Sequence, residues 1–317
     1  NKLHVMVMLL LRAGGKLLGL FSAITIGLSL VHAFQLKQKL KMSLDDPLAG
    51  KTVGFIGCGK ITTAVAKGLA RGPDGLRPRQ LIVSPRSTGR STALKQQFPT
   101  YINIAQDNEE VVEQSDIIML GLLPDVAQSI LPALTFRQDQ LIVSMMATPT
   151  EQELFGMVRL PHEQVLKTIP LPGVDTGDGV VLAYPAATLH ARANFPQLLS
   201  LLGTAVPCTQ EAELKPLIAL TANLSPFYEW LDRQATWAAD KGVDPEVARR
   251  FVQATFEALV AGAGREGGDG TPPPSFAELG REAATPGGLN EQAVEFLREE
   301  GHFDLLERSN DAILRRL

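Results

Sequence analysis

A short turn, Gly57-Cys58-Gly59, holds the residues of this chain whose types and spacing most clearly suit chemistry. It follows an apolar strand predicted over 52–56 and precedes a helix predicted, from its apolar spacing, to run to Arg71. Glycine at 57 permits a tight turn, and a missing side chain at 59 lets the backbone approach phosphates at a helix N-terminus. The order of strand, glycine turn and helix therefore favours a site for the pyrophosphate of a dinucleotide.

The third position of this fingerprint is unusual. Thr62 stands where glycine or alanine would let helix and strand pack closely, which weakens the prediction. A structural turn without a ligand is the alternative, and a small residue that fits the turn is the favoured interpretation of Cys58. The residues of the turn that we predict to bind the cofactor are Gly57, Cys58, Gly59, Lys60, Ile61 and Thr62.

The end of the second predicted strand, 80–84, carries hydroxyl groups and a guanidinium but no carboxylate. Proteins that bind NAD usually place Asp or Glu here to hold the ribose 2′-hydroxyl. This chain has Ser84, Arg86 and Ser87 instead, and such donors suit a 2′-phosphate. The sequence therefore predicts NADP(H) rather than NAD(H), with a solvated loop carrying one arginine as the alternative.

Strands and helices alternate from the glycine turn to about residue 183. The predicted strands are 52–56, 80–84, 101–104, 116–123, 141–144, 165–169 and 179–183, and the helices between them include 91–98, 108–114, 124–131 and 150–157. This alternation predicts an α/β fold with a doubly wound sheet, whose ligands bind at the carboxyl ends of the strands. Leu122 lies at the end of the predicted strand 116–123, Pro124 directly follows it, and Ala147 follows the strand 141–144, so we predict that these residues contact the cofactor at the same edge.

The pattern becomes helical from about residue 211, with no strand signal. Aromatic residues such as Trp230 and Trp237 recur mostly at helical spacing, and Asp244-Pro245 is a strong helix start. Aromatic residues at such spacing are typical of a core, and their abundance in a small helical domain also suggests a dimer interface.

A second turn of small residues, Thr285-Pro286-Gly287-Gly288, opens onto a helix predicted over 291–300. The free N–H groups of such a turn are a natural receptor for a carboxylate. An ordinary loop with a helix cap is the alternative interpretation.

Composition excludes several classes of function. The net charge is −4, and the sequence shows no basic cluster that would indicate nucleic-acid binding. Two cysteines do not make a disulfide framework, and the five histidines stand apart from other ligand residues, so no metal site is predicted.

Residues 1–48 form a separate, apolar segment. The run Leu17–Phe34 has about the length of one membrane span. It is interpreted as a signal or organelle-targeting segment, a retained anchor, or upstream sequence that is not part of the fold. We predict a cytoplasmic protein, with an organelle-targeted or membrane-anchored one as the alternative.

From about Lys51 to its end the chain resembles a pyrroline-5-carboxylate reductase. The motifs that carry the resemblance are IGCGKIT, Ser84 to Ser87, LGLLPDV, KTIPLPGVDTGDGVVLAYP, ATPGGLN and LREEGHFDLLERSNDAI. The most specific match is Thr285 to Gly288, where family members have Ser-Pro-Gly-Gly. The resemblance implies an NADP-binding Rossmann domain over 49–208, followed by an all-α dimerisation and substrate domain over 209–317.

The resemblance also implies an activity, the reduction of the C=N bond of 1-pyrroline-5-carboxylate to L-proline with NADPH. The first turn would hold the pyrophosphate, and Ser84, Arg86 and Ser87 the 2′-phosphate. Asn290 and Thr285 are the expected catalytic residues, with Asn290 near the ring nitrogen. The residues expected to bind the substrate are Thr285, Gly287, Gly288, Leu289 and Asn290.

Three departures from the family fall around the expected pocket. Leu123 replaces a lysine, Leu171 replaces an asparagine, and 222–228 is bulkier than the family's SGSGPAY. A divergent NADP-dependent reductase of another imine or carbonyl, or a non-catalytic NADPH-binding paralogue, is therefore an alternative. A 3-hydroxyacid dehydrogenase fits less well, because Ala219 stands four residues after Lys215, where those enzymes have an asparagine.

Overall fold

The structure, a computed structural model, describes residues 48–265 and 271–317 of the chain. The apolar run Leu17–Phe34, with its three interpretations, lies outside the described residues. Among the helices that the structure describes, none combines the length and the apolar character that a membrane span requires.

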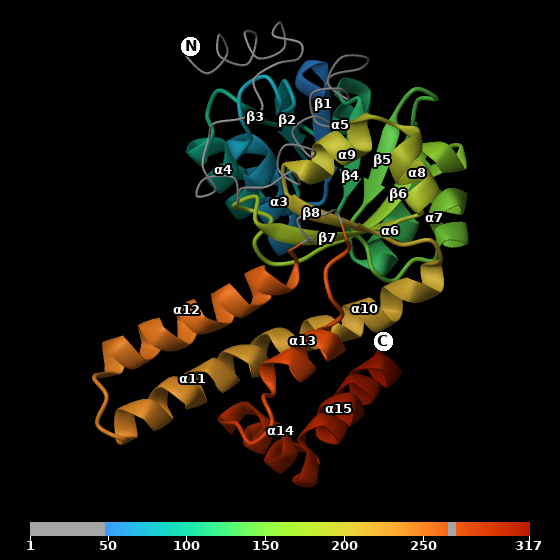
Figure 1. Cartoon of the computed structure of the whole chain (residues 1–317). Helices are drawn as coiled ribbons and strands as arrows, with labels where there is room; N and C mark the ends of the chain where they lie inside the picture. The colour runs from blue at the N-terminus through green and yellow to red at the C-terminus, as the bar shows by residue number, and fades with distance from the viewer. Residues whose placement is uncertain (1–47, 266–270) are drawn as a thin grey trace, which may run out of the picture.

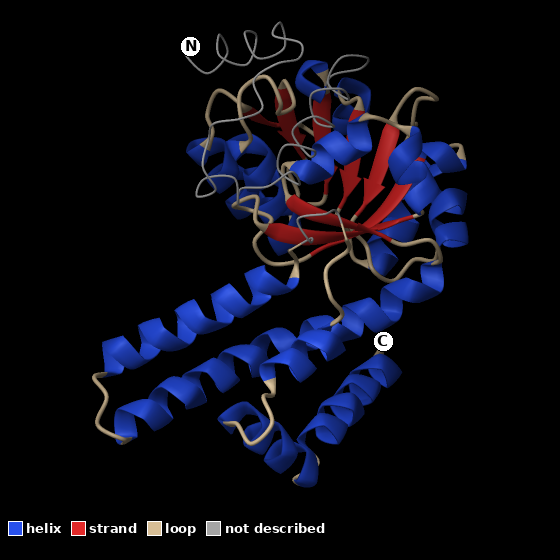
Figure 2. Ribbon diagram, viewed as in Figure 1, coloured by secondary structure: helices blue, strands red, loops and turns tan. Residues whose placement is uncertain are grey.

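The described residues contain an eight-stranded sheet with the order β3-β2-β1-β4-β5-β6-β7-β8 (Figures 1 and 2). The strands are β1 (Thr52–Ile56), β2 (Gln80–Val83), β3 (Ile102–Ile104), β4 (Ile117–Leu120), β5 (Leu141–Ser144), β6 (Val165–Pro170), β7 (Gly179–Tyr184) and β8 (Gly203–Pro207). Strands β1 to β6 pair in parallel, β7 pairs antiparallel with β6, and β8 pairs in parallel with β7. The sheet therefore confirms the predicted α/β fold.

Helices cover both faces of the sheet. They are α3 (Lys60–Arg71), α4 (Thr88–Gln97), α5 (Asn108–Gln114), α6 (Pro124–Ile130), α7 (Glu151–Val158), α8 (Ala186–Ala191) and α9 (Asn194–Ser200). One apolar core joins the sheet to α3, α4 and α9, and a second joins it to α5, α6 and α7. Strands β1, β4 and β5 are buried along their whole length, which explains their near-continuous apolar sequences.

The structure differs from the predicted elements at several points. Strand β8 and helices α8 and α9 were not predicted; the half-exposed strand GTAVP lacks the buried apolar run that identifies β1, β4 and β5. The apolar run 116–123 forms strand only over Ile117–Leu120, and Pro124 already begins helix α6. Helix α4 begins at Thr88, three residues earlier than predicted.

The chain after the sheet is helical. Its helices are α10 (Leu214–Leu220), α11 (Leu224–Asp240), α12 (Pro245–Ala263), α13 (Phe276–Ala283), α14 (Leu289–Glu299) and α15 (His302–Arg316). The predicted helix start at Asp244 is confirmed, because its carboxylate accepts hydrogen bonds from the N–H groups of Glu246 and Val247. Helices α11 and α12 form a long hairpin that projects from the sheet (Figure 1).

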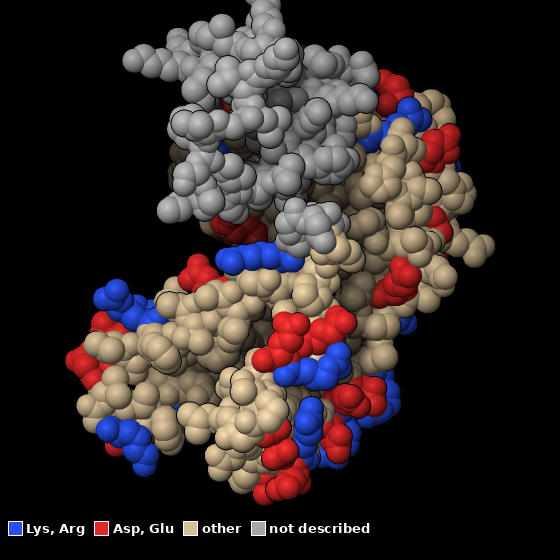
Figure 3. Space-filling model, in the orientation of Figure 1, with Lys and Arg blue, Asp and Glu red and all other residues tan. Residues whose placement is uncertain are grey.

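The α11–α12 hairpin carries large apolar side chains that face solvent. Trp230 packs its ring 4.8 Å from that of Phe256, yet Trp230 is 39% exposed and so is not the core residue that its spacing predicts. Tyr228, Trp237 and Phe251 are between 64% and 70% exposed. Much of the visible surface over these helices is uncharged (Figure 3). Apolar exposure on this scale is typical of a surface that another protein covers.

Candidate functional site

The glycine turn gives α3 an N-terminus that no side chain caps. Gly57 has φ +90°, in the left-handed region that favours glycine, and a Cβ there would overlap the carbonyl oxygen of Gly121. A Cβ on Gly59, the N-cap residue, would meet open space, so protein packing does not require glycine at 59. The first N–H groups of α3 have no side-chain cap, and a phosphate bound at this N-terminus would explain the glycine at 59. We call residues 57–62 the first cradle.

The end of β2 lies directly beside the first cradle. Ser84 is fully buried, and its hydroxyl accepts a hydrogen bond of 3.0 Å from the N–H of Gly57. Arg86 is exposed and Ser87 is partly exposed, so both can reach a ligand. Of the three residues predicted to hold a 2′-phosphate, Ser84 therefore lies beneath the turn, where it fixes the turn's backbone.

The ends of β4 and β5 complete the same edge of the sheet. Because β1, β2, β4 and β5 are parallel neighbours, their carboxyl ends bring the four sets of residues to one side. Leu123 is 73% exposed, Leu122 is partly buried, and Pro124 is the first residue of α6. Ala147, in the loop after β5, is exposed. All the predicted cofactor residues thus lie along one edge.

A buried lysine ties this edge to the start of the helical region. Lys167 of β6 is 5% exposed, and its Nζ donates to the carbonyl oxygen of Pro149 at 2.5 Å and to Oε1 of Glu211 at 2.7 Å. The same Oε1 accepts a bond of 2.9 Å from the N–H of Glu151, whose carboxylate accepts from the hydroxyl of Tyr184 at 2.8 Å. These bonds fix the loop after β5 relative to the segment that leads into α10.

Two groups near the edge have shifted pKa values. Burial raises the pKa of the Cys58 thiol, while a hydrogen bond with Thr63 and the charge of Arg90 oppose that rise. Burial, with the neighbouring Glu151 carboxylate, raises the pKa of Tyr184 to about 12. Both groups are therefore protonated at neutral pH, and Cys58 is a small buried side chain rather than a reactive thiolate.

The second turn, residues 285–290, is exposed, and some of its N–H groups already donate hydrogen bonds within the chain. We call it the second cradle. Gly287 has φ +70°, and its N–H donates to Oε2 of Glu291 at 2.6 Å. The N–H of Gly288 donates to the carbonyl oxygen of Thr285 at 2.8 Å. The side-chain amide of Asn290 donates to the carbonyl oxygen of Ala283 at 3.0 Å. A carboxylate from the chain itself thus occupies one of the donors predicted for a substrate carboxylate.

The two cradles lie in different parts of the molecule. The second cradle joins α13 to α14, which Figure 1 shows beside α11 and α15 rather than on the sheet. Among the described residues, no hydrogen bond or ion pair joins the second cradle to the edge that holds the first. The structure thus gathers the predicted cofactor residues and keeps the predicted substrate residues separate from them.

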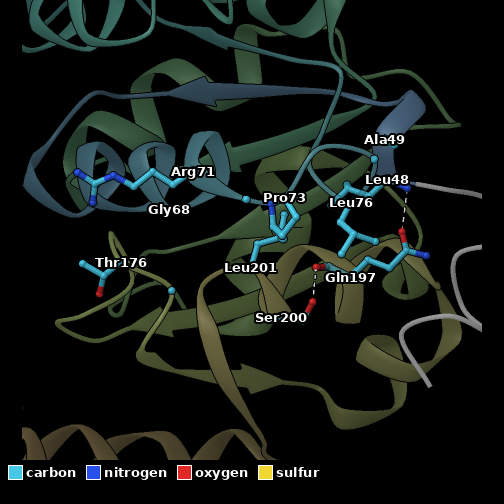
Figure 4. A pocket seen from close by; sticks show the side chains of 13 residues that line it. Leu48, Ala49, Gly68, Arg71, Pro73, Leu76, Thr176, Gln197, Ser200 and Leu201 are labelled. Carbon is cyan, nitrogen blue, oxygen red and sulfur yellow. Dashed lines mark hydrogen bonds between the residues drawn. The ribbon is translucent and has the colours of Figure 1, made fainter. Parts of the chain in front are cut away.

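A further pocket, drawn in Figure 4, is lined by no residue of either cradle. It has a volume of about 210 Å³ at the far end of α3, and its lining includes Arg71, Thr176 and Gln197. Arg71 donates to the carbonyl oxygen of Asp175 at 2.7 Å, and the side chain of Gln197 accepts from the N–H of Leu48 at 2.8 Å. The polar groups of this pocket hold the fold together, and it is not part of the cofactor edge.

Three residues with a bearing on the edge were not predicted. Lys167 lies within a strand sequence that gives no sign of a buried charge, and its partner Glu211 is distant in sequence. Gly121 lies within an apolar run that was assigned wholly to a strand. Arg90 stands three residues after Ser87, in a segment without acidic residues, and that charge imbalance is the signal that could have found it.

Comparison with known proteins shows what this chain is similar to. Residues 52–148 match the family described as NADP oxidoreductase, coenzyme F420-dependent. The pyrroline-5-carboxylate reductase of Pseudomonas aeruginosa is 26% identical over 271 residues, which is 83% of this chain and 94% of that protein.

Two solved structures share the fold. The 1-pyrroline-5-carboxylate reductase of Streptococcus pyogenes has a TM-score of 0.68 at 20% identity and covers 84% of this chain and 98% of its own. An imine reductase from a Pseudomonas species has a TM-score of 0.51 at 18% identity, covering 84% and 91%. The similarity to pyrroline-5-carboxylate reductases thus spans sheet and helices alike, in the order that the motifs predicted. The chain is therefore similar to pyrroline-5-carboxylate reductases over most of its length.

Proposed function

We propose that this protein reduces the C=N bond of 1-pyrroline-5-carboxylate to L-proline with NADPH. The observation that carries the proposal is the first cradle, in which an uncapped helix N-terminus and open space over Gly59 fit a pyrophosphate. Exposed Arg86 beside it, with no carboxylate at the end of β2, favours NADP(H) over NAD(H). Similarity to pyrroline-5-carboxylate reductases over most of the chain supports the reaction.

The chemistry asks the side chains mainly for positioning. The nicotinamide, when bound, supplies hydride to the imine carbon. Thr285 and the N–H groups of Gly287, Gly288 and Leu289 hold the substrate carboxylate in this proposal. Asn290 orients the ring nitrogen by a hydrogen bond, and because an amide is a poor acid, the proton comes from solvent or arrives on the substrate. Such positioning can supply about 7–11 kcal/mol of the barrier.

We take 49–208 as the cofactor domain and 209–317 as the helical domain, and we infer that two copies associate through the helical one. Trp237 and Phe251, exposed on the α11–α12 hairpin, would be covered by a second copy. The second copy would also bring its second cradle to the first cradle of its partner, which explains why one chain alone keeps them apart.

Mixed dimers test this arrangement. Gly59→Asp places a carboxylate in open space over the first cradle, so the fold tolerates it while phosphate is repelled. Coexpression of Gly59→Asp with Asn290→Ala should restore about a quarter of wild-type activity, since half of the dimers then contain one intact site of two. Recovery of no activity, from a mixture shown to contain mixed dimers, would place both cradles of each site in one chain.

The substrate is tested by following NADPH absorbance with purified protein from Met42 to Leu317. The panel contains 1-pyrroline-5-carboxylate, cyclic imines without a carboxylate, and 2-oxo acids. The proposal expects the first compound to give the highest kcat/KM. No oxidation of NADPH with any compound, despite measurable NADPH binding, would instead support a non-catalytic NADPH-binding paralogue.

Another imine or carbonyl is the second candidate substrate. Leu123, 73% exposed at the edge, and Glu291, which already occupies the N–H of Gly287, favour a less polar compound than a carboxylate. A higher kcat/KM for an imine without a carboxylate would support this alternative and remove 1-pyrroline-5-carboxylate as the main substrate.

A further inference from the structure

A buried lysine lies beside the cofactor edge. Strand β6, with the sequence VLKTIP, is buried along its whole length, yet its third residue is Lys167. The register of the sheet pairs Lys167 with Ser144, the last residue of β5, on one side and with Tyr184 of β7 on the other. The side chain of Lys167 is 6% exposed. Its charge is therefore held inside the protein, level with the point where the chain leaves β5.

The chain that leaves β5, residues 145–149, is held at both ends and exposed in its centre; we call it the β5 loop. At its start, the N–H of Met145 donates to the last carbonyl oxygen of β4 at 2.8 Å. At its end, the carbonyl oxygen of Pro149 accepts from Nζ of Lys167 at 2.5 Å. Ala147, between these two bonds, is exposed. The position of the exposed centre thus depends on the bond that Lys167 donates.

The β5 loop lies at the part of the edge that the reducing end of a dinucleotide would reach. In the sheet, β2 and β4 flank β1, and β5 is next to β4. The first cradle follows β1, and the residues predicted to hold the 2′-phosphate follow β2. A dinucleotide with its pyrophosphate at the first cradle and its 2′-phosphate near β2 therefore extends its nicotinamide toward the ends of β4 and β5.

The second partner of Lys167 comes from the start of the helical region. Oε1 of Glu211 accepts from Nζ of Lys167 at 2.7 Å and from the N–H of Glu151 at 2.9 Å. Glu151 is the first residue of α7, the helix that follows the β5 loop. Glu211 opens a 3₁₀-helix, Glu211–Glu213, that leads directly into α10. One carboxylate oxygen therefore joins β6, the start of α7 and the entry to the helical region.

Stability by itself does not account for this pair. Moving two charges out of water is costly, and replacing a buried ion pair by apolar residues of similar volume is often neutral or stabilising. An apolar residue at 167 would also match the other buried positions of β6. An ion pair with further hydrogen bonds adds direction, because each bond constrains the distance and angle between its two groups. The pair therefore suits a site where geometry matters more than stability.

We propose that Lys167 and Glu211 are positioning residues for the reduction, which together hold the β5 loop in a fixed place relative to the helical region. This inference rests on the proposed function. Neither side chain touches substrate or cofactor; both act through the loop that carries Ala147. Loss of the pair lets the loop shift, and a displacement of about 1 Å between reacting groups can slow a reaction about a hundredfold. Nucleotide affinity changes little, because the first cradle follows β1, two strands away.

Hydride transfer and nucleotide binding, measured separately, test the proposal. Transfer is followed in a single turnover by NADPH absorbance with the best imine of the substrate panel, and the Kd of NADPH is measured without substrate. Lys167→Met removes the charge and should slow transfer about ten- to a hundredfold while the Kd stays within about threefold. Lys167→Arg should restore most of the rate, because a guanidinium can donate to both partners. Glu211→Gln keeps an oxygen that accepts both bonds, so it should slow transfer less, by about three- to tenfold.

Hydrogen exchange in the protein without nucleotide reports on the loop directly. Backbone N–H groups of residues 145–151 should exchange about tenfold faster in Lys167→Met than in the wild type, because opening of this segment costs less free energy when the bond to Pro149 is lost. Glu211→Gln should change the exchange of the same segment in the same direction.

Arg77→Met is the matched control. Like Lys167, Arg77 donates to one backbone carbonyl oxygen, that of Ala70 at 2.6 Å, and pairs with one carboxylate, that of Asp74 at 2.7 Å. It precedes β2 and so lies at the opposite end of the strands from the cofactor edge. Its loss should lower stability and leave both hydride transfer and exchange of the β5 loop unchanged.

Three results would overturn the inference: hydride transfer at the wild-type rate in Lys167→Met, slowing no greater than that in Arg77→Met, or unchanged exchange of residues 145–151. Failure of the proposed function has a different signature, because the wild type itself would then oxidise no NADPH with any compound of the panel, and the catalytic role of the pair would fall with it.

Discussion

The hydroxyl of Thr62 and the bare Cα of Gly121 face each other where α3 packs on the end of β4. A Cβ on Gly121 would overlap Oγ1 of Thr62, and it would lie 3.3 Å from Cε of Met145. Thr62 is fully buried, and its hydroxyl has no hydrogen-bond partner. The threonine that weakens the dinucleotide fingerprint is thus accommodated by a glycine on the neighbouring strand. The small residue that allows close packing of helix and strand is normally at the third position of the fingerprint, on the helix. Here it is Gly121, at the end of the facing strand.

This pair predicts a non-additive double mutant. Gly121→Ala alone should cost about 1–3 kcal/mol in the free energy of unfolding, because its methyl group overlaps Thr62. Thr62→Ala should cost less, since it also removes an unsatisfied buried hydroxyl. In denaturant unfolding, the double variant should lose about 1 kcal/mol less unfolding free energy than the sum of the two single losses. Additive costs would mean that the overlap is relieved elsewhere.

Thr62 also shows how far the sequence could predict the site. The strand, turn and helix from 52 to 71 were predicted because each has a local signal: an apolar run, two glycines and apolar spacing. The compensating Gly121 is distant in sequence and carries no such signal. Side-chain direction is likewise set by packing, which is why Ser84 was assigned to a phosphate although its hydroxyl points to Gly57. Arrangement between distant segments, as between the two cradles, has no local signal at all.

Substitutions at Lys167 should distinguish the contribution of its charge to stability from that of its size. Lys167→Met breaks the pair with Glu211 and the bond to Pro149, and should cost about 2 kcal/mol in the free energy of unfolding. The cost is below that of a fully buried pair because the Glu211 side chain is 31% exposed and can be solvated. Lys167→Arg should recover most of the loss. Arg233→Ala, which breaks an exposed pair with Glu229, is the control and should cost about 0.5 kcal/mol or less.

Capping carboxylates predict acid sensitivity. Backbone and hydroxyl hydrogen bonds from Thr150 lower the pKa of Glu153, and those from Ser275, the hydroxyl first, lower the pKa of Glu278. A carboxyl group whose pKa is lower in the folded state stabilises that state at pH values above 4.5, the pKa of the unfolded state. This stabilisation is lost as the pH falls through the lower pKa of the folded state. The temperature at the midpoint of thermal unfolding should therefore decrease as the pH is lowered below about 4.5.

Substitution isolates this contribution. Glu153→Gln and Glu278→Gln should each flatten the loss of thermal stability between neutral and acid pH, while Glu113→Gln, on the exposed side of α5, should leave it unchanged. If thermal stability decreases with pH as steeply in both capping variants as in the wild type, other groups cause the acid sensitivity.

Asn290 predicts a division between turnover and cofactor binding. Asn290→Ala should lower kcat at least tenfold and leave the Kd of NADPH within about twofold, if its amide orients the ring nitrogen. The same amide donates to the carbonyl oxygen of Ala283, so a purely structural role would instead lower stability and spare kcat. Unfolding free energy measured beside kcat distinguishes the two roles, and unchanged kcat would remove Asn290 from the mechanism.

Removal of the negative charge of Glu291 should increase the affinity for a carboxylate substrate. Its carboxylate accepts from the N–H of Gly287 at 2.6 Å, the same donor that the proposal assigns to the substrate carboxylate. Glu291→Gln removes a like charge from the N-terminus of α14, so KM for a carboxylate substrate should fall about two- to fivefold, from roughly 0.3–1 kcal/mol of repulsion. KM for an imine without a carboxylate should not change, and this compound is the control. A KM that rises for the carboxylate substrate alone would mean that Glu291 holds the turn in its binding geometry rather than competing for it.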